Sequence, residues 1–145
     1  MTHKDLLRDP ARSGVFRLPE TVAWVSQVSA TDFAVWRVNL AKVRSKAGLL
    51  AALAKTLEFP DWFGHNWDAL QDCLTDLSWR PALRYVVVLE NCEGLAASAP
   101  EAFETTLEVF RHAARWWAGE QVPFWVFVGG LGENQPRLPS VDAAG

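Results

Sequence analysis

The sequence predicts an α/β fold in which a small three-stranded parallel sheet has helices packed on it. Three runs of β-branched and aromatic residues have the composition of strands, over residues 33–40, 84–90 and 124–128. Segments in which apolar residues recur at helical spacing separate these runs. Because strands that alternate with helices pair in parallel through right-handed crossovers, the runs predict one parallel sheet.

Length and composition indicate a single domain. The chain has 145 residues, of which 50% are hydrophobic, enough for a sizeable core. We place the domain at residues 32–128, after an N-terminal extension over residues 1–31 whose apolar patches are able to pack on the core. Residues 129–145 begin with a glycine-rich stretch and are expected to form a flexible C-terminal tail.

The chain carries no signal for export or membrane insertion that we recognise. Its first residues have charges of both signs and no apolar stretch after them, unlike a secretory signal. No run approaches the ~18–20 apolar residues of a membrane span. The two cysteines, Cys73 and Cys92, are too few and too unpatterned for a disulfide framework or a metal site. We therefore expect a cytoplasmic protein with reduced cysteines and no membrane contact.

The first strand leads into a helix with a clear start. After residues 33–40 and a short polar connection, Ser45 is suited to cap a helix over residues 46–57. Four leucines share one face of that helix: Leu49, Leu50, Leu53 and Leu57. We expect this face to pack on the sheet.

The second half of the chain repeats the alternation of strand and helix. Residues 84–90 are almost continuously apolar, which is typical of a strand covered on both faces, so we expect this strand to be the central one. Pro100 suits the first turn of a long helix over residues 101–117, and Gly119 ends it. The last strand, residues 124–128, follows.

An aromatic turn lies between the first helix and the second strand. Pro60 and Gly64 bracket it and leave Trp62 and Phe63 few ways to be buried. Asn66 is a good N-cap for the helix that follows. Tryptophan is among the anchors favoured at interface centres, so the turn is a candidate docking surface.

The helix that begins at residue 67 is acidic on one side. Its apolar residues form one stripe: Trp67, Leu70, Cys73, Leu74 and Leu77. Asp68, Asp72 and Asp76 recur every fourth residue on the opposite side. Residues 58–78 contain five acidic residues and no Lys or Arg, although the net charge of the chain is only −3. This concentrated charge favours a cationic partner.

These residues also carry a family resemblance. Residues 60–75 read Pro-Asp-Trp-Phe-Gly-His-Asn-Trp-Asp-Ala-Leu-Gln-Asp-Cys-Leu-Thr. They resemble the signature of the barstar family, the intracellular inhibitors of barnase-type secreted ribonucleases, and the broader likeness runs from about residue 33 to residue 128. The sequence Thr-Asp-Leu-Ser-Trp over residues 75–79 looks like that of the larger bacterial barstar-like proteins. The resemblance implies the barstar fold.

The resemblance also implies a partner and a set of contact residues. The partner would be a cationic, barnase-like ribonuclease, bound 1:1 by an immunity protein whose acidic helix and aromatic loop plug the active site. Asp72 matches the family's dominant anchor, Asp68 its other key carboxylate and Trp62 an interface tyrosine. The residues expected to bind the partner are Trp62, Gly64, His65, Asn66, Trp67, Asp68, Asp72, Asp76 and His112. Two departures, Gln71 in place of a tryptophan and His112 in place of a contact glutamate, imply a different partner surface.

Other classes of function have less support in the sequence. Cys73 with His65 or His112 is the combination closest to a catalytic set, but Cys73 lies on the apolar stripe, so we expect no enzyme. The exposed aromatic residues lie among carboxylates, which repel a phosphate backbone, so we expect no nucleic acid. No phosphate loop or zinc spacing occurs, so we expect no cofactor and no metal. The alternative that stays open is a barstar-fold antitoxin or interaction module whose partner is not a ribonuclease.

Overall fold

The computed structural model describes residues 7–18, 33–131 and 138–139. The elements follow in the order η1 (Pro10–Arg12), β1 (Val15–Arg17), β2 (Phe33–Asn39), α3 (Lys46–Thr56), α4 (Trp67–Leu74), β3 (Arg84–Glu90), α5 (Glu93–Ser98), α6 (Pro100–Gly119) and β4 (Phe124–Val128). The three predicted strands and the three predicted helices are present. The short helices η1 and α5 were not predicted.

The sheet is parallel, as predicted, but it has four strands and not three. Its order is β1-β4-β3-β2, and every neighbouring pair is parallel. The added strand β1 comes from the N-terminal extension and pairs with β4, with Val15 opposite Val126. A strand of three residues is too short to show a periodic pattern, which explains why the sequence did not place it in the sheet. Strand β3 lies between β2 and β4, which confirms its inner position.

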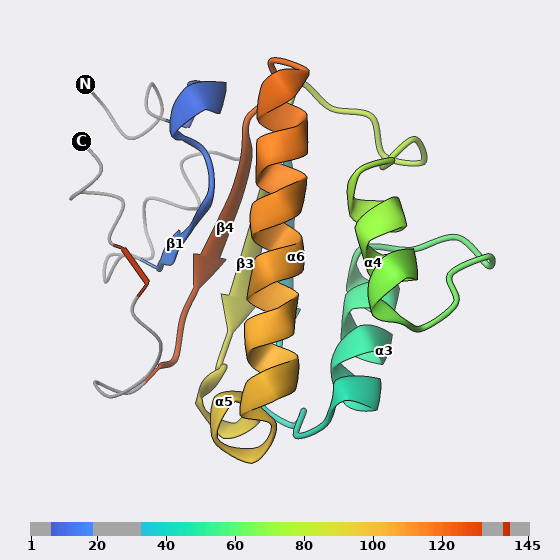
Figure 1. Ribbon diagram of the computed structural model, residues 1–145, viewed down its shortest axis with the longest axis vertical. Helices are drawn as coiled ribbons and strands as arrows, with labels where there is room; N and C mark the ends of the chain where they lie inside the picture. Colours follow the sequence, from blue (N-terminus) through green and yellow to red (C-terminus); the bar gives the residue numbers. More distant parts are fainter. Residues whose placement is uncertain (1–6, 19–32, 132–137, 140–145) are drawn as a thin grey trace.

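Helices cover one face of this sheet. Figure 1 shows α6 in front of the sheet, running alongside β3 and β4, with α3 and α4 beside it and the segment between α3 and α4 projecting outward. Alternate residues of β3 divide between the two faces. Tyr85, Val87 and Leu89 join the core under the helices, whereas Val86 and Val88 join a second cluster on the opposite face.

The N-terminal extension contributes to that second cluster. Leu7 is fully buried there beside Trp125 and Phe127, whose rings stack at 5.9 Å. The Trp125 Nε1–H donates to the Leu7 carbonyl oxygen at 3.0 Å, which satisfies a buried indole. The described part of the extension therefore belongs to the fold.

Two residues of the predicted flexible tail also pack on the protein. Leu138 is buried in the core, and the Pro139 carbonyl oxygen accepts a hydrogen bond of 2.9 Å from the Arg17 amide of β1. The remainder of the extension, over residues 1–6 and 19–31, and tail residues 132–137 and 140–145 lie outside the described residues.

The helix caps follow the predicted chemistry. The Ser45 Oγ accepts from the Gly48 amide at 3.1 Å and opens α3, whose leucines are buried. Pro100 occupies the first turn of α6. Near the other end of α6, the Trp117 Nε1–H donates to the Leu74 carbonyl oxygen at 2.7 Å and ties this helix to the end of α4. Within the described segments, no helix has both the length and the apolar character of a membrane span.

Candidate protein-binding site

In the aromatic turn between α3 and α4, one aromatic ring is buried and holds the turn in place, and another is exposed to solvent. Trp62 is 55% exposed, as predicted. The prediction for Phe63 was wrong, because this ring is buried against Phe59 at 4.9 Å and His65 at 4.7 Å. Phe59 in turn contacts Trp79, which follows α4, so residues on both sides of α4 hold the turn in place. Trp62 is therefore presented from a supported loop.

The end of the turn is shaped by a cap. The Asn66 Oδ1 accepts from the Ala69 amide at 2.8 Å, and its Nδ2 donates to the Gly64 carbonyl oxygen at 3.3 Å. A Cβ atom at Gly64 would lie 3.0 Å from the same Nδ2, so a larger residue would disturb the cap. Between them, His65 has a φ of 54° and an exposed side chain. Gly64, His65 and Asn66 thus set the direction in which α4 starts.

Helix α4 presents two carboxylates to solvent. Its apolar residues Leu70, Cys73 and Leu74 are fully buried in the core. Asp68 and Asp72, one turn apart, are exposed on the other side. Neither forms an ion pair with any described cation. The predicted acidic face is therefore present and electrostatically unbalanced.

The third aspartate, Asp76, lies just beyond the end of α4. Helix α4 ends at Leu74, and the chain turns through Leu77, which has a φ of 50°. Asp76 lies in that turn, where its Oδ2 accepts from the Ser78 hydroxyl at 3.3 Å. The Leu77 amide donates to the Cys73 carbonyl oxygen at 3.1 Å, and the positive φ of Leu77 then ends the helical run. The Thr75 Oγ1–H donates to the Gln71 carbonyl oxygen at 2.8 Å. Asp76 is exposed, two residues after the end of α4.

The thiol beneath the acidic face is a core group. Burial raises the pKa of Cys73 to about 11, and the negative charges of Asp72 and Asp76 add to the effect. Burial likewise raises the pKa of Cys92 to about 12. Since the thiolate is the reactive form, neither side chain is suited to act as a nucleophile at neutral pH.

The predicted contact residue on α6 comes from a different helix than the others. His112 is exposed on this helix, which packs against α4. No hydrogen bond between described residues links it to Asp68 or Asp72. Trp116, one turn further along α6, is 42% exposed and was not predicted as a contact residue. The sequence could have indicated its exposure, because Trp116 lies outside the buried face of α6 that includes Phe103, Leu107 and Phe110.

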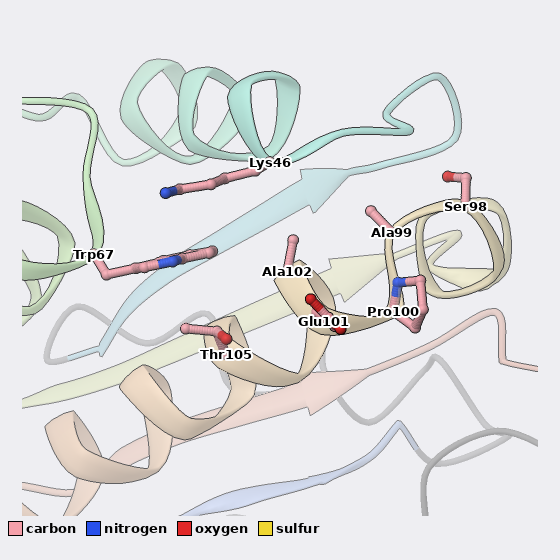
Figure 2. A pocket seen from close by; sticks show the side chains of 8 residues that line it. All are labelled: Lys46, Trp67, Ser98, Ala99, Pro100, Glu101, Ala102 and Thr105. Carbon is pink, nitrogen blue, oxygen red and sulfur yellow. The ribbon is translucent and has the colours of Figure 1, made fainter.

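Trp67 lies in a pocket and not on the acidic face. An open pocket of about 560 Å³ separates the start of α4 from α3 and from the start of α6 (Figure 2). Its lining residues are Lys46, Trp67, Ser98, Ala99, Pro100, Glu101, Ala102 and Thr105. The Trp67 indole points into the pocket, and the Lys46 Nζ lies over the ring, 5.0 Å from its centroid. Because the lining comes from separate segments, no local motif predicted it.

No group of three or more His, Cys, Asp or Glu residues within the described ranges is arranged to hold a metal ion. The chemistry that these surfaces offer is recognition. Carboxylates on a convex helix, with an indole beside them, are suited to bind a cationic protein surface.

Comparison with known protein families identifies the family to which most of the chain is similar. A family model described as Barstar (barnase inhibitor) matches residues 33–129. The match covers more than half of the chain, from the start of β2 through β4, and includes the aromatic turn and the acidic face. It leaves out β1 and the rest of the N-terminal extension.

Proposed function

The chain belongs to the barstar family, and we propose that it is the intracellular inhibitor, or immunity protein, of a barnase-type secreted ribonuclease. The family is described by inhibition of barnase, so its members are inhibitors and not enzymes. In our proposal, the protein acts in the cytoplasm and binds its nuclease 1:1.

The observation that best supports the proposal is the pair of carboxylates on α4 that no described cation neutralises. A ribonuclease gathers Arg, Lys and His residues to hold the phosphates of its substrate. Asp68 and Asp72 place two carboxylates one helical turn apart on a convex surface, with no described cation paired to them. Such a surface can occupy the phosphate sites and be drawn to them by electrostatic steering.

The neighbouring side chains support the same mode of binding. Trp62 projects from the supported turn and offers an indole to the rim of the nuclease active site. We assign Asp72 as the central anchor, Asp68 as the second carboxylate, and Trp62 as the aromatic contact. Gly64, His65 and Asn66 shape the surface between the indole and the carboxylates. His112 and Asp76 lie further out and are assigned to the periphery.

Inhibition of purified nucleases tests the proposal. Barnase and a panel of related secreted ribonucleases are assayed with a fluorogenic RNA while the protein is titrated. We expect at least one of them to be inhibited with 1:1 stoichiometry. Asp72→Ala should lose inhibition, whereas Glu104→Ala, which removes an exposed carboxylate from α6, should keep it. No inhibition across the panel at micromolar concentration would contradict the proposal.

A second candidate function is supported by the sequence departures. Gln71 and His112 stand where the family has a tryptophan and a contact glutamate, and Trp116 adds an exposed indole. These changes suit a barstar-fold interaction module with a different cationic partner. Capture of one defined protein that is not a ribonuclease, lost in Asp72→Ala, would favour this function over the first.

A further inference from the structure

We propose that the pocket beside α4 receives an arginine side chain of the bound partner, stacked on Trp67 and paired with Glu101. This inference rests on the proposed function, because it adds a contact to the same interface. Trp67 is among the residues expected to bind the partner, and its indole points into the pocket from the start of α4, the helix that also carries Asp68 and Asp72. The pocket is open and large enough for a side chain, at about 560 Å³.

The Trp67 ring already holds a cation. The Lys46 Nζ lies 5.0 Å from the ring centroid, within the range of a cation–π interaction. Lys46 is the first residue of α3, and its side chain is exposed. No hydrogen bond or ion pair to another described residue holds this ammonium group. Lys46 is therefore able to rotate into solvent and leave the ring to a partner cation.

The opposite wall of the pocket supplies the counter-charge. Glu101 is exposed in the first turn of α6, and Figure 2 shows it with Thr105 on the side of the pocket formed by that helix. Ala99 and Ala102 form an apolar part of the lining, against which the methylene stem of a long side chain can pack. The pocket thus offers an aromatic face, a carboxylate and an apolar surface together.

This combination favours arginine over other groups. A guanidinium group is planar, stacks on aromatic rings and presents a fork of donors that matches a carboxylate. An ammonium group cannot stack in the same way. An anionic group would meet the like charge of Glu101, which lines the pocket. The proposed partner is itself cationic, so it can supply an arginine, whose positive charge complements Glu101 and whose planar group stacks on Trp67.

A small probe tests the pocket without the partner. N-acetyl-arginine methylamide is titrated into the full-length protein while the Trp67 indole N–H is followed by NMR, with N-acetyl-lysine methylamide as the comparison. We expect a saturable shift for the arginine probe, at least threefold tighter in Lys46→Ala and lost in Glu101→Gln. Lys55→Ala removes the same charge from an exposed site on the same helix and should leave the shift unchanged. No shift in Lys46→Ala would overturn the proposal.

Kinetics with the inhibited ribonuclease give the second test. Trp67→Leu and Glu101→Gln should each raise Kd by about 3- to 30-fold, the range expected for a partly desolvated cation–π or ionic contact. Lys46→Ala should lower Kd more than Lys55→Ala, and this difference should vanish when Trp67→Leu is also present. Loss of binding in Asp72→Ala without any effect of Trp67→Leu would refute the pocket and leave the proposed function standing. Failure of the unmodified protein to bind any nuclease would refute the function instead.

Discussion

Helices α4 and α6 pack on the same face of the sheet, but they carry charge in different ways. On α6, Glu108 and Arg111 form an ion pair one turn apart. The sheet shows the same compensation, because Arg37 of β2 pairs with Glu90 of β3. On α4, the exposed charges are all negative, and the described residues provide no ion pair for them.

In the proposed function, this difference separates a supporting helix, α6, from a binding helix, α4. Helix α6 has 20 residues and buries seven of them, so its main contribution is to the core. Helix α4 has only eight residues, and it places an uncompensated carboxylate at each of two successive turns. Like charges at this spacing cost about 0.2–0.5 kcal/mol in stability. A surface that lowers stability in this way is better explained by binding than by folding.

The largest expected effect is the loss of the central carboxylate. Asp72→Ala should raise Kd for the ribonuclease roughly 100-fold, because leaving a buried partner cation unpaired costs about 3 kcal/mol. Its melting temperature should stay the same or rise, since repulsion along α4 is relieved. Glu104→Ala on α6 should change Kd less than about twofold, as expected for a charge away from the contact. Stopped-flow binding and thermal melts measure both quantities, and a collapsed melting temperature for Asp72→Ala would contradict this view of α4.

The next expected effect is on the association rate. Steering between opposite charges is screened over a Debye length of ~8–10 Å near physiological salt. Association should therefore slow about tenfold or more between low and high salt, within the range over which charge raises such rates. Dissociation should change much less. An association rate that is independent of salt would show that the acidic face does not act in the encounter.

Intermediate effects are expected from the neighbours of Asp72. Asp68→Ala and Trp62→Ala should each raise Kd about tenfold, less than Asp72→Ala, because each lies toward one side of the contact and keeps part of its hydration. Both should fold normally, since Asp68 is exposed and Trp62 is 55% exposed. Equal and small losses for Asp68, Asp72 and Asp76 would instead indicate diffuse electrostatics without an anchor.

The sequence predicted best those elements that depend on neighbouring residues, such as a long apolar run or a capping side chain. Strand β3 was predicted to the residue, and the Ser45 and Asn66 caps form as expected. Strand β1 was not identified as part of the sheet, because its three residues gain their place by pairing with β4, which is remote in the sequence. Phe63 is buried against Phe59, which in turn contacts Trp79 from beyond α4, and this second contact is encoded by no local pattern.

In the candidate site, too, local features were predictable from sequence and contacts between remote segments were not. The exposure of Asp68, Asp72 and Trp62 follows from helical spacing and turn chemistry, so these positions were predictable. The pocket was not, because Lys46 and Glu101 meet Trp67 only when three helices pack. Helical spacing alone also carried α4 past its end at Leu74, since spacing does not reveal the positive φ at Leu77 that turns the chain.

A smaller effect should appear in the pH dependence of stability. The Cys73 thiol has a normal pKa near 9.0 when unfolded and about 11 in the folded protein. Between these values the unfolded chain loses its proton first, so the free energy of unfolding falls as pH rises. Cys73→Ala should reduce this slope without abolishing it, because Cys92 is shifted in the same direction. Chemical denaturation from pH 8 to 11 measures the slope, and an unchanged slope in Cys73→Ala would argue against the assigned shift.

The smallest expected effect concerns the aspartate that lies beyond α4. Asp76 is exposed in the turn after the helix and accepts a hydrogen bond from Ser78, so it stays hydrated when Asp72 is covered. A charge at the rim mainly alters the association rate. Asp76→Ala should therefore raise Kd less than about threefold, almost entirely through slower association, as for an exposed ion pair worth under about 1 kcal/mol. Adding 0.5 M salt should remove this difference but not the effect of Asp72→Ala. Faster dissociation in Asp76→Ala would place this aspartate inside the contact and extend the binding surface past the end of the helix.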